Sequence, residues 1–361
     1  MPRVRARGEE IRRYILENTK SNPSSISKLA SDHFRISRQA VNAHLNRLVK
    51  EGALREKGAT RNKAYELCPI VRWQGGYSLS TGTALAEDYI WRTDIEKVFG
   101  QLRDNVRMIW HYGFTEVFNN AIDHSEGSQV DVAITKTAIN TEMVIADDGV
   151  GIFRKIQKAM ALEDERHAIF ELSKGKLTTD PDHHSGEGLF FTSRVFDGFD
   201  ILSGGVYFSH EMGKEEDWMS ELAKPSDGTA VFMRLSNHSS KTLGKVFDDF
   251  AEGPDAPGFN KTMVPVRLAR YGKDQLLSRS QAKRVMARVE LFSTVILDFE
   301  DVETIGQAFA DEVFRVFANA HPQIKIVPVK TNPEIDRMIR RINLSSFEDR
   351  GAKPSSSGES E

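Results

Sequence analysis

The sequence is poor in cysteine and lacks long apolar runs. Cys68 is the only cysteine among 361 residues, which rules out an internal disulfide and a zinc site built from several cysteines. No apolar run is long enough to cross a bilayer. Residues 1–7, Met-Pro-Arg-Val-Arg-Ala-Arg, lack the apolar stretch of a secretory signal peptide. We therefore expect a cytoplasmic protein without a membrane partner.

Charge is distributed unevenly along the chain. Residues 1–70 contain 15 Lys and Arg against 7 Asp and Glu, a net charge of +8, whereas the remainder contains 34 against 45, a net charge of −11. A small basic segment joined to an acidic body is typical of a nucleic-acid-binding region attached to other domains. A basic surface that is merely solvated has the same composition, so charge alone leaves both interpretations open. The length predicts two or three domains.

The basic segment, 1–70, has the pattern of three helices followed by a hairpin. Apolar spacing and turn signals predict helices within 8–20, 25–34 and 37–52, and two short strands within 53–68. In the third helix, Val41, Leu45 and Leu48 form an apolar stripe, and Ser37 is placed to be its N-cap.

This order of elements resembles a winged helix-turn-helix domain, which implies DNA binding. Amide side chains on the polar face of the third helix are suited to base edges, and cations in the hairpin are suited to phosphate. The candidate DNA-binding residues are Arg38, Gln39, Asn42, Asn46, Arg61 and Lys63. A winged helix that contacts protein instead of DNA is the alternative.

A second region contains an unusual helix. Within "TEVFNNAIDHSEGS", Glu116, Asn120 and Asp123 stand at i, i+4 and i+7 and share one helix face. No basic residue follows until Lys136. A solvated helix face normally mixes charge signs, so three oxygen-bearing side chains without a cation need an explanation.

Glycine-rich motifs follow this helix in a fixed order. "VIADDGVGIF" ends an apolar strand at Asp147, "HHSGEGLFF" opens a helix, and "SDGTAVFM" begins a strand. Each motif alone is weak, because glycine between elements usually marks a turn. The order and spacing of the helix and these three motifs resemble the ATP-binding fold of the GHKL family, which includes gyrase, sensor histidine kinases and MutL. The similarity covers roughly residues 84–236.

The resemblance implies Mg-ATP as the cofactor and assigns roles to individual residues. Asn120 would join the Mg²⁺ shell, Glu116 would act on the attacking group at the γ-phosphate, and Asp147 would accept the adenine amino group. A structural role for Asp123 is as compatible as a nucleotide contact. The further nucleotide-binding candidates are Gly149, Gly151, Lys174, Gly186, Gly188, Leu189 and Thr229. Residues 153–185 would form a lid.

The C-terminal segment alternates helix and strand. "TVILDFEDVETIGQAFADEVF" resembles STAS-like domains of the DUF4325 type. In related anti-anti-sigma factors the helix after the strand starts with a phosphorylated serine, whereas Gln307 and Ala308 occupy the matching positions here. The resemblance therefore implies an interaction or sensing module rather than a target for its own ATPase domain.

The predicted fold is multidomain α+β. It combines a winged helix at 1–70, a GHKL α/β sandwich at 84–250 with a mixed sheet and helices on one face, a small α/β STAS-like domain at 259–345 and a disordered tail at 346–361. The predicted function is a DNA-binding regulator gated by nucleotide, with slow Mg-dependent ATP hydrolysis. The alternative is a serine/threonine protein kinase of the anti-sigma-factor type acting on a separate partner. A homodimer and a protein partner bound through the STAS-like domain stay open.

Overall fold

The computed structural model describes residues 2–59, 63–79, 85–177, 186–211, 217–253, 258–269 and 275–351. The chain is α+β and divides into two compact units. Unit 1 comprises Met1–Gly151, Val195–Leu202 and Asp227–Thr242, and unit 2 comprises Ile152–Arg194, Ser203–Ser226 and Leu243–Glu361. The units differ from the domains expected from sequence breaks, because unit 2 combines part of the segment 84–250 with the whole C-terminal segment.

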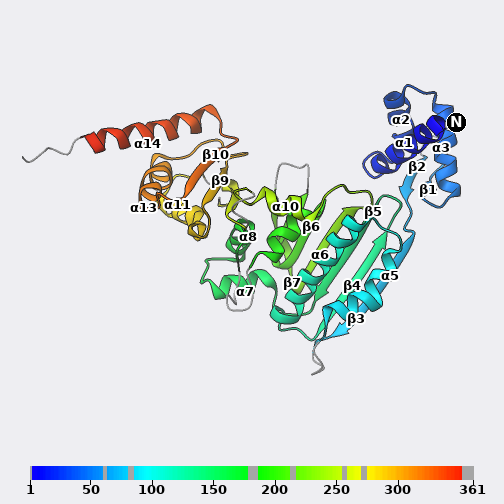
Figure 1. Ribbon diagram of the computed structural model, residues 1–361, viewed down its shortest axis with the longest axis horizontal. Coiled ribbons are helices and arrows are strands. Elements are labelled where there is room, and N and C mark those ends of the chain that lie inside the picture. Colours follow the sequence, from blue (N-terminus) through cyan, green and yellow to red (C-terminus); the bar gives the residue numbers. More distant parts are fainter. Residues whose placement is uncertain are drawn as a thin grey trace, which may run out of the picture. The chain divides into compact units, whose positions relative to one another are not determined.

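The N-terminal part of unit 1 contains three helices and a hairpin, as the apolar spacing predicted (Figure 1). Val41, Leu45 and Leu48 are buried in its core, and the Ser37 hydroxyl accepts a hydrogen bond from the Ala40 amide. The elements are α1 (Pro2–Thr19), α2 (Ile26–Phe34), α3 (Arg38–Lys50) and the antiparallel strands β1 (Leu54–Lys57) and β2 (Ala64–Leu67).

A five-stranded sheet follows, in the order β3-β4-β5-β7-β6. The pairs β3–β4, β4–β5 and β5–β7 are all antiparallel, whereas we expected a mixed sheet. Of these pairs, only β4 and β5 are joined by a short connection, residues 137–139, which excludes the long crossover that a parallel pair needs. The strands are β3 (Val71–Ser78), β4 (Gln129–Lys136), β5 (Asn140–Asp147), β6 (Gly198–Glu211) and β7 (Asp217–Ser236).

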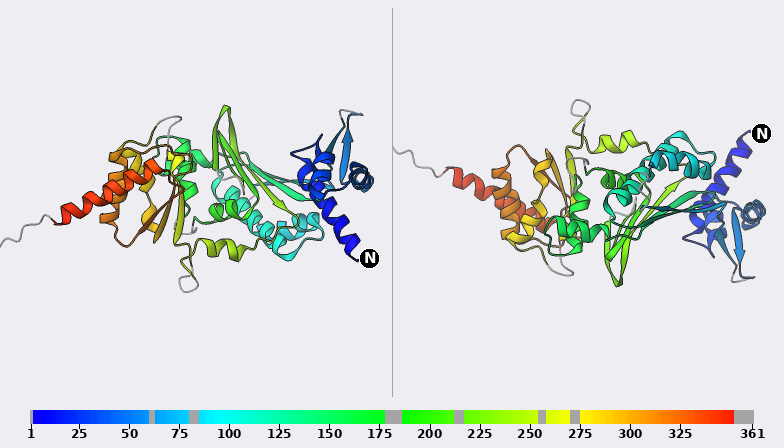
Figure 2. Two further views of the ribbon diagram at one scale, coloured as in Figure 1. Left: turned by 90° about the horizontal axis from the view of Figure 1, so that it is seen from above. Right: turned by 90° about the horizontal axis from the view of Figure 1, so that it is seen from below.

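Helices cover one face of this sheet, which Figure 2 shows nearly edge-on. The longest, α6 (Asp104–His124), buries an apolar row that includes Trp110, Phe114 and Phe118. Gly113 lies in the same row, and a Cβ there would overlap the ring of Phe196. The other helical elements between β3 and β4 are α4 (Glu87–Ile90), a π-helical turn (Trp91–Ile95) and α5 (Glu96–Phe99).

Unit 2 contains a three-stranded parallel sheet in the order β10-β9-β8 and the helices around it. Its first elements are α7 (Ile152–Ala159), α8 (Glu165–Lys174), α9 (Gly188–Val195) and α10 (Leu243–Asp249). Then follow β8 (Lys261–Pro265), a 3-10 turn (Val266–Ala269), α11 (Arg279–Met286), a second 3-10 turn (Val289–Leu291) and β9 (Thr294–Asp298). The last are α12 (Gln307–Asp311), a π-helical stretch (Glu312–Phe317), α13 (Ala318–Ala320), β10 (Lys325–Val329) and α14 (Pro333–Gly351).

Three predictions fall partly or wholly outside the described residues. Arg61 is one of them, and the lid expected at 153–185 is another, because 178–185 are not described. The third is the tail expected to begin at residue 346: α14 continues to Gly351, and 352–361 are not described. Within the described ranges, no helix combines the length and the apolar character needed to cross a membrane.

Candidate functional site

The carboxylate of Asp147, at the end of β5, is held by backbone amides. Its Oδ1 atom accepts hydrogen bonds from the amides of Gly149 at 2.9 Å and of Thr229 at 3.3 Å. Asp147 and Thr229 are also register partners across β5 and β7. Neither amide uses Oδ2. Burial raises the pKa of Asp147, and the two amide hydrogen bonds oppose that shift. The result is a half-buried, oriented acceptor whose second oxygen can receive a donor from a ligand.

Two glycines permit the close backbone approach around Asp147. A Cβ on Gly149 would overlap the carbonyl oxygen of Ser125, and a Cβ on Gly228 would overlap the carbonyl oxygen of Asp147 itself. Gly228 also has a φ of +74°, and Gly151 one of +87°, which L side chains rarely adopt. The amide of Val150 donates to Ser125 at 2.8 Å. The glycines thus allow the ends of α6 and β5 and residues 228–229 of β7 to meet.

Asp148 is a second organising carboxylate that the sequence did not single out. It accepts hydrogen bonds from the amides of Ser128 at 2.7 Å and Gln129 at 2.9 Å, and from the Ser128 hydroxyl. The hydrogen bond from the Ser128 side chain is the main cause of the lowered pKa of Asp148. The doubled Asp in "ADDG" is the only signal in the sequence. Asp148 fixes the loop between α6 and β4.

The three polar residues of α6 lie on the helix as expected. Glu116 and Asn120 are half-buried, and Asp123 is exposed. The Asn120 amide nitrogen donates to the carbonyl of Glu116 at 2.6 Å. This hydrogen bond does not involve the amide oxygen, which is the atom that a Mg²⁺ ion would need.

The residues present fit a magnesium ion that arrives with a ligand, rather than a resident metal. Within the described ranges, no three His, Cys, Asp or Glu side chains gather as metal ligands. One neutral amide cannot hold Mg²⁺ by itself, because the ion keeps an octahedral shell of oxygens. Phosphate and water would have to complete that shell around Asn120.

The second glycine motif belongs to unit 2. Gly186 has a φ of +71°, and a Cβ there would overlap the backbone of Leu177. The Leu177 amide donates to the Gly186 carbonyl at 3.0 Å. Gly188 is the first residue of α9, and Leu189, next to it, is half-buried.

Lys174 does not lie where a contact with phosphate was expected. Its side chain is 1% exposed. Its ammonium donates to Glu171 at 2.7 Å and to the carbonyls of Arg284 at 3.0 Å and Ala287 at 2.9 Å. These three acceptors match the three N–H donors of a lysine. Lys174 is therefore committed to contacts inside unit 2 in this structure.

The expected DNA-binding residues of α3 share an exposed face. Arg38, Gln39, Asn42 and Asn46 are all exposed. The Asn42 amide oxygen also accepts a hydrogen bond from Ser27 at 3.0 Å.

The hairpin cations are less available for phosphate than their sequence suggested. Lys63 pairs with Glu56 at 2.6 Å, and Lys57 and Arg55 both pair with Glu66 at 2.9 Å. Two carboxylates thus offset part of the positive charge on the hairpin.

Comparison with known proteins identifies the C-terminal segment. The sequence pattern of a family described as a STAS-like domain of unknown function (DUF4325) matches residues 281–336, which run from α11 into α14. No curated protein matches the chain. The helix α12 begins at Gln307, after the N-cap Gly306, so the residues at its start carry no hydroxyl. The C-terminal part of this chain is a STAS-like domain, as its sequence predicted.

Proposed function

We propose that this chain is an ATP-binding regulator of the GHKL type, in which the nucleotide state controls DNA binding by a winged N-terminal domain. The observation that carries the proposal is the Asp147 carboxylate, with Oδ1 held by the Gly149 and Thr229 amides and Oδ2 outside those hydrogen bonds. An ionised carboxylate in that position accepts the exocyclic amino group of adenine and rejects a purine that has a carbonyl there.

The chemistry proposed for α6 follows from its side chains. Bound Mg²⁺ and triphosphate would supply an activated phosphoryl group with its charge neutralised. Asn120 would contribute an amide oxygen to the metal shell, and Glu116, one turn earlier, would orient the attacking water and accept its proton. By resemblance, the backbone at Gly186 and Gly188 binds phosphate. Lys174 is left out, because its ammonium is already bonded.

The DNA part of the proposal rests on α3. Its exposed face offers the amides Gln39, Asn42 and Asn46 next to the cation Arg38. Amides can read base edges in a major groove, and arginine adds a phosphate or guanine contact. The net charge of +8 over residues 1–70 supports the approach to a polyanion.

The test measures DNA binding and nucleotide binding by the same full-length protein. Fluorescence anisotropy on a pool of genomic fragments is compared without nucleotide, with Mg-ATP and with Mg-ADP, and thermal shift with Mg-ATP reports nucleotide binding separately. We expect a thermal shift with Mg-ATP and a change in DNA affinity between the nucleotide states. Absence of the thermal shift would overturn the nucleotide assignment, and equal DNA affinity in all states would overturn the gating.

A further inference from the structure

The last residue of α8 caps a helix of the STAS-like domain. The Lys174 ammonium donates to the carbonyls of Arg284 and Ala287 at the end of α11. Carbonyls in the last turn of a helix lack partners within the helix, and a cation there also interacts favourably with the helix dipole. Since Lys174 is buried, this contact is part of the core of unit 2 rather than a surface ion pair.

A buried carboxylate connects the same contact to the residues after α11. Glu171 is 4% exposed and pairs with Lys174 at 2.7 Å and with Arg288 at 3.2 Å. Arg288 also donates to the Lys176 carbonyl, and the Lys176 ammonium donates to Leu291 at 3.0 Å. A buried ionic network of this kind adds little net stability, because desolvation offsets the attraction. Burial accordingly lowers the pKa of Lys174 to about 8. The structural effect of this ionic network is to fix the position of α8 against the end of α11.

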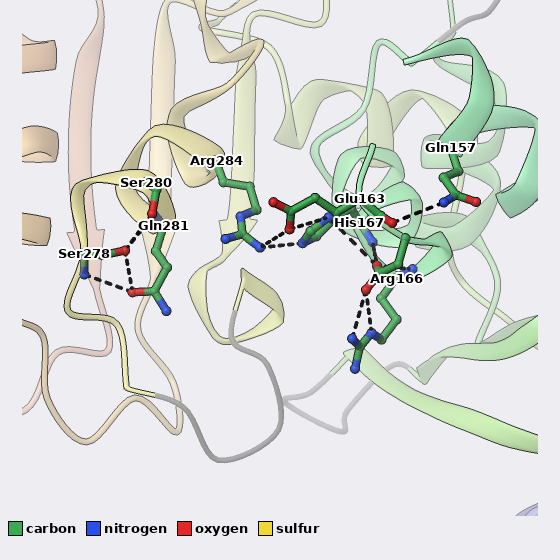
Figure 3. Close-up of polar contacts among 9 residues, drawn as sticks. Gln157, Glu163, Arg166, His167, Ser278, Ser280, Gln281 and Arg284 are labelled. Carbon is green, nitrogen blue, oxygen red and sulfur yellow. Dashed lines mark hydrogen bonds and ion pairs between the residues drawn. The ribbon is translucent and has the colours of Figure 1, made fainter. Parts of the chain in front are cut away.

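The remainder of α8 also contacts the STAS-like domain. The hydroxyl of Thr262, on the edge strand β8, donates to the Lys174 carbonyl at 2.6 Å. Near the other end of α8, the His167 ring lies 2.5 Å from the Arg284 guanidinium, and Glu163 pairs with Arg284 at 3.7 Å (Figure 3). The helix is therefore attached to α11 near both of its ends.

The anchored segment contacts the second glycine motif at Leu177. Leu177, three residues after Lys174, is hydrogen-bonded to Gly186 and occupies the space that a Cβ on Gly186 would need. In α9, Phe190 stacks on Phe259 with ring centroids 4.6 Å apart, and Phe259 contacts Phe292 at 5.0 Å. The STAS-like domain therefore contacts Lys174 and Lys176, close to Leu177, and Phe190 in α9.

We propose that the STAS-like domain positions the second glycine motif through Lys174, so that the contact between α8 and α11 sets the affinity of the chain for ATP. This inference rests on the proposed nucleotide site. Lys174 acts as a positioning residue, because its ammonium is bonded to Glu171 and to two carbonyls of the STAS-like domain and it acts on Gly186 through Leu177. Thermodynamic reciprocity requires that bound ATP strengthens the contact between α8 and α11 by the same factor.

The test compares full-length wild type with Lys174→Met and Lys330→Met. Lys330 directly follows β10, the edge strand opposite β8, and pairs with Glu300 and Asp298. Its loss therefore perturbs the STAS-like domain without touching α8. We expect Lys174→Met to weaken Mg-ATP binding about tenfold, and to speed amide hydrogen exchange over 186–190. Lys330→Met should change neither.

The outcomes separate this inference from the proposed function. Wild-type affinity in Lys174→Met, or unchanged exchange over 186–190, overturns the positioning role. Absence of binding in the wild type overturns the nucleotide assignment, and the exchange measurement then still decides whether Lys174 supports Gly186. Should Lys174→Met not fold, Arg288→Gln breaks the same network from a partly exposed residue of the STAS-like domain and carries the same expectation.

Discussion

Thr229 donates its backbone amide to the carboxylate of Asp147, the residue opposite it across strands β7 and β5. The carboxylate is thereby oriented by the sheet as well as by the Gly149 amide in the loop after β5. Groups placed on rigid elements keep their geometry better than groups on loops. Substitution of Asp147 therefore tests both nucleotide binding and the stability of the fold.

Asp147→Asn should weaken nucleotide binding without lowering the stability of the fold. The asparagine oxygen can still accept from the Gly149 and Thr229 amides, but a donor replaces the acceptor offered to adenine. Loss of a hydrogen bond to a charged group predicts about 1.5–3 kcal/mol weaker Mg-ATP binding by calorimetry. Asp131→Asn, on an exposed position of β4, is the control. Unchanged affinity in Asp147→Asn would remove this residue from the nucleotide site.

The raised pKa of Asp147 sets the direction of the stability effect. Because the folded protein holds this proton more tightly than the unfolded chain, ionisation of Asp147 lowers stability as the pH rises through the window between the two pKa values. Asp147→Asn removes that loss. Its thermal midpoint at pH 7 should therefore equal or exceed that of the wild type, and a lower midpoint would contradict the assigned shift.

Local signals in the sequence predicted much of unit 1. Alternating apolar residues and the turn at Asn140 predicted β4 and β5, and Ser37 predicted the start of α3. The strand β3 was not predicted, because Gly75 and Gly76 have the signature of a turn. In the structure the Trp73 ring covers Gly75 and the Asp131 carboxylate lies against Gly76. These contacts depend on tertiary packing.

The parts that sequence did not predict depend on residues far apart in the chain. Lys174 had the pattern of a solvated or phosphate-binding lysine, and it is buried by carbonyls 110 and 113 positions away. The edge strand β8 is short and ends at Pro265, so it has no periodic signal of its own. The grouping of α8 with the STAS-like domain follows from these contacts.

Gly149→Ala should destabilise unit 1 and abolish nucleotide binding. The added Cβ would overlap the Ser125 carbonyl oxygen, so the backbone beside Asp147 must move. Overpacking of this kind predicts about 2–3 kcal/mol of lost stability in denaturant unfolding. Gly244→Ala in α10 is a matched control, since no atom lies within 4 Å of its Cβ position. That control should be neutral or stabilising by about 0.5–1 kcal/mol.

Glu116→Ala should separate nucleotide binding from chemistry. Removal of a group that acts on the attacking water predicts a loss of about 10²-fold or more in turnover, with Mg-ATP affinity retained. Phosphate release from γ-labelled ATP measures turnover, and label found on protein would favour the protein-kinase alternative. Asp104→Ala, at the exposed start of the same helix, is the control. Wild-type turnover in Glu116→Ala would exclude its catalytic role.

Substitutions in α3 should affect DNA binding in two distinguishable ways. Gln39→Ala should reduce discrimination between selected and random duplexes by about 1–3 kcal/mol, since an amide reads base edges. Arg38→Ala should weaken binding to all sequences and lower the salt slope by about 1. Lys63→Ala should have a smaller effect, because Lys63 pairs with Glu56. Weak, salt-insensitive retention of every duplex by the wild type would instead indicate a protein-contact module.

Unit 2 should lose stability in mild acid through His167. Burial, and next the charge of Arg284, lower the pKa of His167 below its ordinary value of 6.5, while the carboxylates of Glu163 and Asp164 oppose the shift and Arg166 adds to it. The unfolded chain therefore binds this proton more readily than the folded protein. Stability is complete above pH 6.5 and falls as the pH drops through the window between 6.5 and the lowered folded-state pKa.

His167→Gln should flatten this dependence. Glutamine cannot acquire a charge beside Arg284, so the variant should lose less of its thermal midpoint than the wild type between pH 7.5 and pH 5.5. His321→Gln, at a ring that stacks on Phe317 in the STAS-like domain, controls for the loss of a histidine elsewhere in unit 2. The same slope in His167→Gln and wild type would show that the acid sensitivity arises elsewhere. A flatter slope would mean that protonation of one buried ring weakens the attachment of α8 to α11, because His167 lies at that contact.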